Sequence, residues 1–213
     1  MCYTMYIQRA VFTNVSPVVK IAAFFFCAPT FDDMTGGSEM FQAGDHIIYG
    51  NTGVCRVEEV CRRDDLPPDA HGTLFYRLMP LHSSCTIYIP VDSPVFMRPV
   101  VTRAQALDLI ARIPAIREDD FQPDDPKLLA AHYKDFFRSH ACEDLIQLIK
   151  TVYHKNQAMA HRGRRPPKTD NQYMQQAEAL LNDELSVALD IPSTDVPDFI
   201  AQTLEQKTTA SNA

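Results

Sequence analysis

The 213-residue sequence lacks the spacings that mark common catalytic and nucleotide-binding motifs. It contains no HExxH, GxSxG or GxGxxG pattern and no P-loop. Its seven histidines are spread along the chain without a nucleophile–base pair that sequence can identify. We therefore expect a protein that is not an enzyme and that has no catalytic residues and no cofactor. A hydrolase whose site is assembled from distant residues stays open as an alternative.

Cysteine pairs at regular spacing are also missing. No CxxC occurs among the six cysteines, a usage that fits reduced thiols and predicts a cytoplasmic protein. His82 with Cys85, and His140 with Cys142, each offer two soft ligands, whereas a structural zinc site needs four. We therefore expect no metal site.

No hydrophobic run is long enough to cross a membrane. The longest candidate, residues 21–29 (IAAFFFCAP), is far shorter than the roughly 20 residues that a spanning helix needs. Arg9 and Lys20 precede it, but the segment imitates a signal peptide poorly. We expect no membrane association, with export as the alternative.

Residues 1–39 show no sustained helical or strand period, and dense turn and strand signals begin only after them. Gly36-Gly37-Ser38-Glu39 precedes Met40, and two glycine codons beginning GGA-GG would spell a purine-rich ribosome-binding sequence before that methionine. We predict that residues 1–39 are a non-native extension and that a protein beginning at Met40 folds without them.

Residues 40–113 are predicted to form one small β domain. Turn residues and a charged, proline-containing loop at 62–72 separate short strands, and His82-Ser83-Ser84 is a hairpin turn. About five strands favour a small barrel, because a short sheet must curl to bury its core and hide its edges. A helix follows, with Thr102 and Gln105 as its capping box. The strand candidates named by pattern are residues 47–49, 54–60, 74–81 and 85–91.

Residues 114–126 carry three prolines and five acidic residues, which favours a linker and places the domain boundary there. The Glu118-Asp119-Asp120 run is predicted to be solvated rather than catalytic. A helical period follows, so residues 127–204 are predicted to be a compact four-helix bundle and 205–213 a disordered tail. The fold class is therefore α+β, a β-barrel followed by an all-α bundle. The helices are expected at 128–137, at 143–161, from a Thr169–Gln172 cap, and around Phe199 and Ile200.

Charge is distributed unevenly along this acidic chain. Its net charge of −7 and pI of about 5.4 argue against coating nucleic acid with the whole surface. Residues 150–168, however, contain cations and no acid, and helical spacing puts Lys150, His154 and His161 on one face. Such a stripe can neutralise phosphates, and the alternative is a solvated surface with a basic loop. The cations are Lys150, Lys155, Arg162, Arg164, Arg165 and Lys168.

The segment FQAGDHIIYGNTGVCRV (residues 41–57) resembles the opening of the CarD family. That family begins with a phenylalanine, a Gly-Asp turn, a strand ending in tyrosine and a Gly-Val pair. The resemblance continues in order and spacing to about residue 200. The later blocks are FYRL (75–78), TIYIPVD (86–92), MRPV (97–100), DLIQLIKTVYHKNQ (144–157) and QAEALLNDELSVALDI (176–191).

The resemblance implies a Tudor-like barrel, shared with transcription-repair coupling factors, that binds the β subunit of bacterial RNA polymerase. The family uses basic residues after its second strand and on its fourth. Arg62 and Arg63 match the first position, while Thr86 and Tyr88 occupy the fourth strand, where Tyr88 is a departure from the basic residue. The alternative for the arginines is plain surface charge.

The resemblance also implies that the helical domain reaches promoter DNA at the upstream edge of the melted bubble. Tyr133 and Lys134 match a Tyr-Lys pair of the family, and Lys155 falls where the family carries a basic residue. One branch places a tryptophan wedge before that pair, whereas this chain has no tryptophan and has Leu129 there. Leucine can wedge a base step, and the alternative is a core role. The expected DNA-contacting residues are Leu129, Tyr133, Lys134, Lys150, His154, Lys155, Arg162, Arg164, Arg165 and Lys168.

Together these features predict a monomeric transcription regulator that modulates open-complex stability without strong sequence specificity. The alternative is a protein-interaction module that makes no DNA contact.

Overall fold

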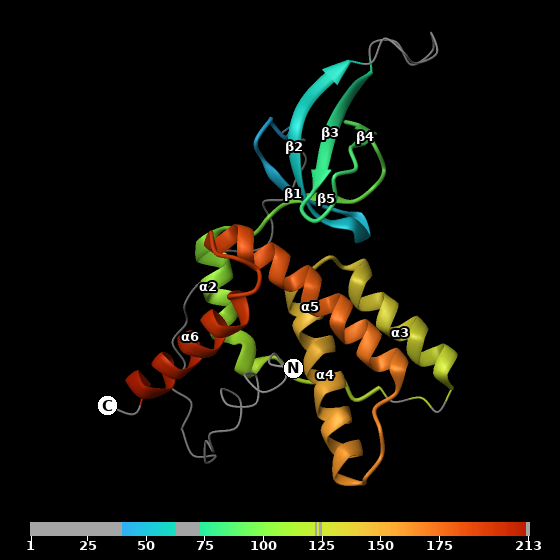
Figure 1. The fold of residues 1–213 in the computed structure, drawn as a ribbon, viewed down its shortest axis with the longest axis vertical. Helices are drawn as coiled ribbons and strands as arrows, with labels where there is room; N and C mark the ends of the chain where they lie inside the picture. The colour runs from blue at the N-terminus through green and yellow to red at the C-terminus, as the bar shows by residue number, and fades with distance from the viewer. Residues whose placement is uncertain (1–39, 63–72, 122, 124, 212–213) are drawn as a thin grey trace, which may run out of the picture.

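The structure is a computed structural model that describes residues 40–62, 73–121, 123 and 125–211. An antiparallel five-stranded sheet unit sits above a helical unit along the long axis of the molecule (Figure 1). This order confirms the α+β class. The predicted extension 1–39 and Arg63 lie outside the described residues. Within the described ranges no helix is both long and apolar enough to span a membrane.

The sheet has the strand order β4-β3-β2-β1-β5 with every pairing antiparallel. β3 and β4 form the predicted hairpin, but the expected barrel is not closed, since no pairing joins β4 to β5 among the described strands. Both edge strands are short, a common way of limiting unwanted edge pairing. The strands are β1 (His46–Tyr49), β2 (Gly53–Arg62), β3 (Leu74–Pro80), β4 (Ile87–Pro90) and β5 (Met97–Pro99), with a 3-10 turn η1 (Gly50–Thr52) after β1.

A β-bulge in β2 sets which side chains enter the sheet core. Val57 pairs with Leu78 and Glu59 with Arg77, so Glu58 has no residue opposite it. The extra residue shifts the alternation by one position, which lets Val57 and Val60 both face the core. The same bulge explains why the β2 sequence alternates imperfectly. The buried core comprises Ile47, Cys55, Val57, Tyr76, Leu78 and Ile89.

Among the described residues, five helices and one 3-10 turn form the helical unit. The Thr102 capping box is present, with Thr102 N donating to Gln105 Oε1 at 2.8 Å and Gln105 N donating to Thr102 Oγ1 at 3.3 Å. The elements are α2 (Arg103–Arg112), η3 (Ile113–Ala115), α3 (Pro126–Arg138), α4 (Cys142–His161), α5 (Lys168–Leu189) and α6 (Val196–Ser211).

Two predicted helix ends are wrong. α5 begins at Lys168 because Pro167 takes the N-cap position, so Thr169 lies inside the first turn and does not cap it. α6 continues to Ser211, and residues 205–211 are therefore helical rather than a disordered tail.

The predicted domain boundary is also wrong. The sequence pattern assigns α2 to the β domain, yet Ala106, Leu109 and Ile110 are buried in the core of the helical unit, as is Ile113 after them. The sheet unit therefore ends near residues 100–102, and residues 114–126 lie within the helical unit. Periodicity locates α2 but gives no information on which core buries its apolar face.

Candidate functional site

The outer face of the sheet carries a row of polar side chains that ends at the edge strand β4. Tyr88 pairs with Arg77, and Arg77 pairs with Glu59, so the three residues lie side by side across three strands. Arg77 Nη1 is 3.5 Å from Glu59 Oε2. Tyr88 is 42% exposed, and Thr86, two residues earlier, is exposed as well. We call Glu59, Arg77, Thr86 and Tyr88 the β4 row.

Arg62 is separated from this row. It is exposed at the end of β2 and pairs with Leu74 of β3. Leu74 is three residues before Arg77, so the two side chains point to opposite faces of the sheet. Because side chains alternate along a strand, Arg62 points to the opposite face. Of the predicted polymerase-binding residues, Thr86 and Tyr88 therefore lie close together, whereas Arg62 lies on the other face. Arg77, which was not predicted, lies beside Tyr88. Strand alternation in FYRL could have identified Arg77, because it is out of phase with the buried Tyr76 and Leu78.

Lys150 is removed from the predicted basic stripe. The residue is only 4% exposed, and its Nζ donates to the carbonyl oxygens of Ile113, at 3.3 Å, and Ile116. Burial lowers the pKa of Lys150, while the nearby Glu118 charge acts in the opposite direction. The prediction that Lys150 meets phosphate is therefore wrong, because its ammonium binds the backbone after α2.

An acidic segment covers this part of α4. Glu118 Oε1 lies 2.9 Å from His154 Nε2 and 3.9 Å from Lys150 Nζ. Asp119 N donates to Thr151 Oγ1 at 2.8 Å, and the Asp119 carboxylate binds His132 of α3. Glu118 and Asp119 are thus partly exposed and contact α4 and α3, whereas Asp120 is exposed. The Glu118 carboxylate faces His154 and so occupies part of the predicted phosphate-binding stripe.

Tyr133 and Lys155, both predicted to contact DNA, instead meet inside the helical unit. Tyr133 is 1% exposed, and its pKa is raised by burial and by the carboxylate of Asp170. Lys155 Nζ lies 2.7 Å from Asp170 Oδ2, and Asp170 is fully buried in the first turn of α5. These contacts assign Tyr133 to the core and engage Lys155 with a buried carboxylate.

Of the two roles considered for Leu129, a wedge in DNA or a core residue, its position in the structure fits the core role. Leu129 packs against the helical core, whereas its neighbour Leu128 is 56% exposed. Lys127, Lys134 and Arg138 are exposed on the same helix and recur at seven- and four-residue steps, so they share one face of α3. Sequence reasoning identifies only Lys134, although the spacing of all three is readable.

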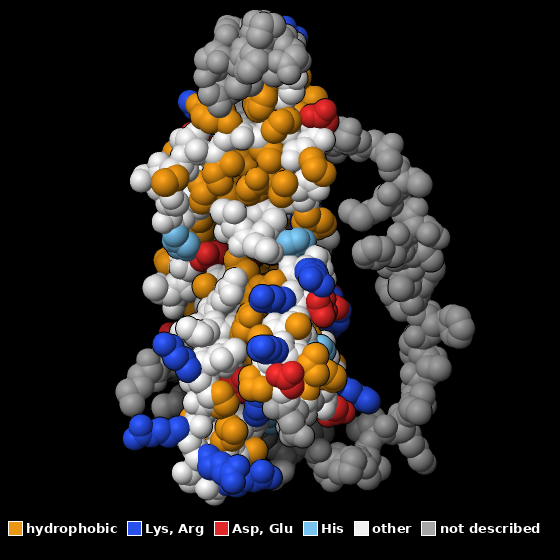
Figure 2. All heavy atoms as spheres, turned by 90° about the vertical axis from the view of Figure 1, so that its right-hand side faces the viewer, with side chains coloured by type: hydrophobic (Ala, Val, Ile, Leu, Met, Phe, Trp, Pro, Cys, Tyr) orange, Lys and Arg blue, Asp and Glu red, His pale blue; other side chains and the backbone are white. Residues whose placement is uncertain are grey.

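The turn between α4 and α5 keeps its cations at the surface. Gly163 adopts a positive φ of 66°, and Arg164 N donates to Met159 O at 2.9 Å, which ends α4 with a glycine cap. Figure 2 shows Lys and Arg side chains at the lower end of the molecule, below an apolar area on the sheet unit. The exposed basic residues from His161 to Lys168, which we call the basic turn, are His161, Arg162, Arg164, Arg165 and Lys168.

Comparison with known families gives a match for the sheet unit. Residues 41–101 match the model of the CarD-like/TRCF RID domain, a type of domain that interacts with RNA polymerase in transcription. Comparison with curated proteins gives no match. The matched residues end where the sheet unit ends and α2 begins. This chain therefore contains, over residues 41–101, a member of the CarD-like/TRCF RID domain family.

Proposed function

We propose that this protein bridges bacterial RNA polymerase and promoter DNA. The sheet unit binds the polymerase β subunit, and the helical unit contacts the duplex at the edge of the melted bubble. The observation that carries the proposal is the family match, which coincides with the sheet unit. The exposed cations of the basic turn and of α3 lie on the other unit.

The β4 edge suits the polymerase contact. An edge strand presents backbone groups to which a partner strand can add, while neighbouring side chains supply specificity. Tyr88 replaces the basic residue that the family carries on this strand, and Arg77 lies beside it on β3. Arg77 therefore offers a cation within the β4 row.

The DNA contact rests on phosphates rather than on base edges. The four basic residues Arg162, Arg164, Arg165 and Lys168 are exposed, as are Lys127, Lys134 and Arg138 of α3. Such side chains bind with little sequence preference and release counterions. Leu128, not Leu129, is the exposed apolar side chain that could enter a groove beside them.

The activity needs no chemical step, and one copy of the chain suffices. A polymerase-bound protein holds its helical unit beside the duplex at high effective concentration, so weak phosphate contacts bias promoter opening. This arrangement lets a protein of net charge −7 act on DNA.

Binding to the β subunit tests the polymerase side. Tyr88→Glu should weaken binding at least about tenfold, because it places a carboxylate at the centre of the proposed interface. Arg62→Glu, on the opposite face, should leave affinity within about twofold. Titration calorimetry with the β subunit measures both, and circular dichroism verifies folding. Unchanged affinity for Tyr88→Glu, or a larger loss for Arg62→Glu, would place the interface elsewhere.

A protein-interaction module without DNA contact is the second candidate. It is favoured by the internal engagement of Lys150, Tyr133 and Lys155, which removes three residues from the predicted DNA surface. The two candidates differ in whether the basic turn affects promoter complexes.

A further inference from the structure

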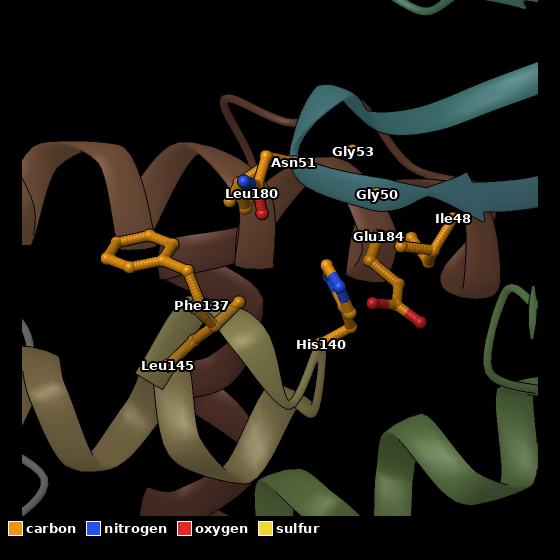
Figure 3. A pocket seen from close by; sticks show the side chains of 9 residues that line it. All are labelled: Ile48, Gly50, Asn51, Gly53, Phe137, His140, Leu145, Leu180 and Glu184. Atoms are coloured by element: carbon orange, nitrogen blue, oxygen red, sulfur yellow. The ribbon is translucent and has the colours of Figure 1, made fainter. Parts of the chain in front are cut away.

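The two units meet at a buried junction. Figure 3 shows Ile48, Gly50, Asn51 and Gly53 of the sheet unit facing Phe137, His140, Leu145, Leu180 and Glu184 of the helical unit. The cavity between them is about 20 Å³, room for roughly one water molecule. The two units are therefore closely packed against each other.

An ion pair lies at the centre of this junction. Arg98 of β5 binds Glu184 of α5 through two bonds, Nη1 to Oε1 at 2.5 Å and Nη2 to Oε2 at 2.8 Å. The same guanidinium donates to the carbonyl oxygen of His140, from Nη2 at 2.6 Å and from Nε at 3.2 Å. Arg98 thus connects the sheet to α5 and to the α3–α4 turn. A lysine could not reproduce this planar fork.

Glu184 is 2% exposed and gathers donors from both units. Val101 N donates to Oε1 at 3.1 Å, and Cys142 Sγ donates to Oε2 at 3.1 Å. Burial acts to lower the pKa of Arg98, but the hydrogen bond and charge of Glu184 outweigh it, so the pKa is raised. The two groups bind each other through paired hydrogen bonds, so removing one partner would leave the other at the junction without its partner.

Further contacts beside the Arg98–Glu184 pair hold the sheet unit against α5. A Cβ on Gly53 would lie 2.7 Å from Leu180 Cδ2, so backbone and side chain are in close contact there. His82 Nε2 is 2.7 Å from Asp183 Oδ1. Leu180, Asp183 and Glu184 follow at three- and four-residue spacing, so one face of α5 meets the sheet unit at successive positions.

A stacked pair of rings also joins the two units. The Phe96 ring lies 4.3 Å from the His140 ring, with an angle of 14° between their planes. His140 has a φ of 52°, so this turn residue adopts the left-handed conformation that also directs its carbonyl to Arg98.

We propose that Arg98 and Glu184 are positioning residues that fix the β4 row at one distance and orientation from the basic turn. This inference rests on the proposed function and adds a requirement to it: the units must act as one rigid body. A flexible joint would spread the helical unit over many positions and lower its effective concentration at the DNA.

The test compares two double variants in the full chain. Arg98→Gln with Glu184→Gln removes the buried pair without leaving an unpaired charge. Arg112→Gln with Glu143→Gln makes the same chemical change at an exposed pair between α2 and α4, and serves as the matched control. Spin labels attached through an unnatural amino acid at Ala43 and Ala160, both exposed, report the distance between the units.

Wild type and control should give one narrow distance distribution, and the junction variant a broad one. In the junction variant, affinity for the β subunit should stay within about twofold, while the protein-dependent lifetime of open promoter complexes falls roughly tenfold. An unchanged narrow distribution would overturn the proposal. So would a broad distribution with an unchanged lifetime.

A milder variant covers the case in which the double variant does not fold. Arg98→Lys keeps the positive charge but cannot bind Glu184 and His140 together, and should broaden the distribution partly. A distribution as narrow as wild type would overturn the assignment to Arg98. The distance measurement needs neither polymerase nor DNA. If the proposed function is wrong, the wild-type protein will not bind the β subunit or affect promoter complexes. The distance distribution will still show whether the two units are rigidly joined.

Discussion

Lys150 holds its ammonium between two backbone carbonyls at a site that water scarcely reaches. A buried cation with satisfied hydrogen bonds stabilises the segment it binds, here the chain that leaves α2. Glu178 presents the opposite case, a half-buried carboxyl whose burial raises its pKa to about 7. Lys150 and Glu178 each lead to a prediction about the free energy of unfolding.

Replacing Lys150 should destabilise the helical unit. Lys150→Met keeps the aliphatic length but removes the ammonium that donates to the carbonyls of Ile113 and Ile116, which should cost about 1–3 kcal/mol. Lys134→Met, at an exposed position of α3, should change the free energy of unfolding by about 0.5 kcal/mol or less. Urea denaturation compares them, and equal effects would mean that Lys150 is not a structural cation.

Glu178→Gln should stabilise the protein at pH 8 and not at pH 4. The folded pKa of about 7 lies above the ordinary value of 4.5, so between these values only the folded state holds the proton. Stability conferred by that proton is complete below pH 4.5 and is lost as pH rises through 7. The gain at pH 8 should be about 1 kcal/mol, a discounted value because solvent reaches part of the carboxyl.

Unfolding measured at both pH values tests this. Asp120→Asn makes the same chemical change at an exposed site and should show no such pH dependence. A pH-independent effect of Glu178→Gln would contradict the assignment.

At the scale of elements, local signals predict where helices and strands form but not which surfaces cover them. The apolar stripe of α4 is readable from its spacing, and Leu145, Leu148, Ile149 and Val152 are all buried. The cations on the same helix are predicted to face solvent. Residue spacing shows which side chains share a face of the helix, but it does not show which part of the chain packs against that face. That neighbour is Glu118, about thirty residues earlier, which only the fold brings to α4.

Turn and strand chemistry shows the same limit. The capping box at Thr102 needs only four consecutive residues, and its prediction is confirmed. The open edge of the sheet depends on how far β4 and β5 lie apart, a long-range property that strand patterns do not contain. The pairing of Lys155 with Asp170 is likewise invisible in a charge count, because it requires α4 and α5 to be packed together.

At the scale of the whole molecule, the family match gives a polymerase-interacting sheet unit, and a buried junction joins it to a helical unit with exposed cations. Glu118 and Asp170 pair with His154 and Lys155 of α4, and the basic turn lies beyond these pairs as a local positive surface on an acidic protein. The bridging account depends on that surface acting on DNA while the sheet unit acts on polymerase.

The salt dependence of open-complex lifetime tests this account most directly. Neutralising Arg162, Arg164, Arg165 and Lys168 together should shorten the protein-dependent lifetime and flatten its log-log salt slope by roughly one for each phosphate that is no longer neutralised. Binding to the β subunit should be unchanged, because these residues lie on the helical unit. An unchanged salt slope with polymerase binding intact would contradict DNA binding by the basic turn and favour the protein-interaction module.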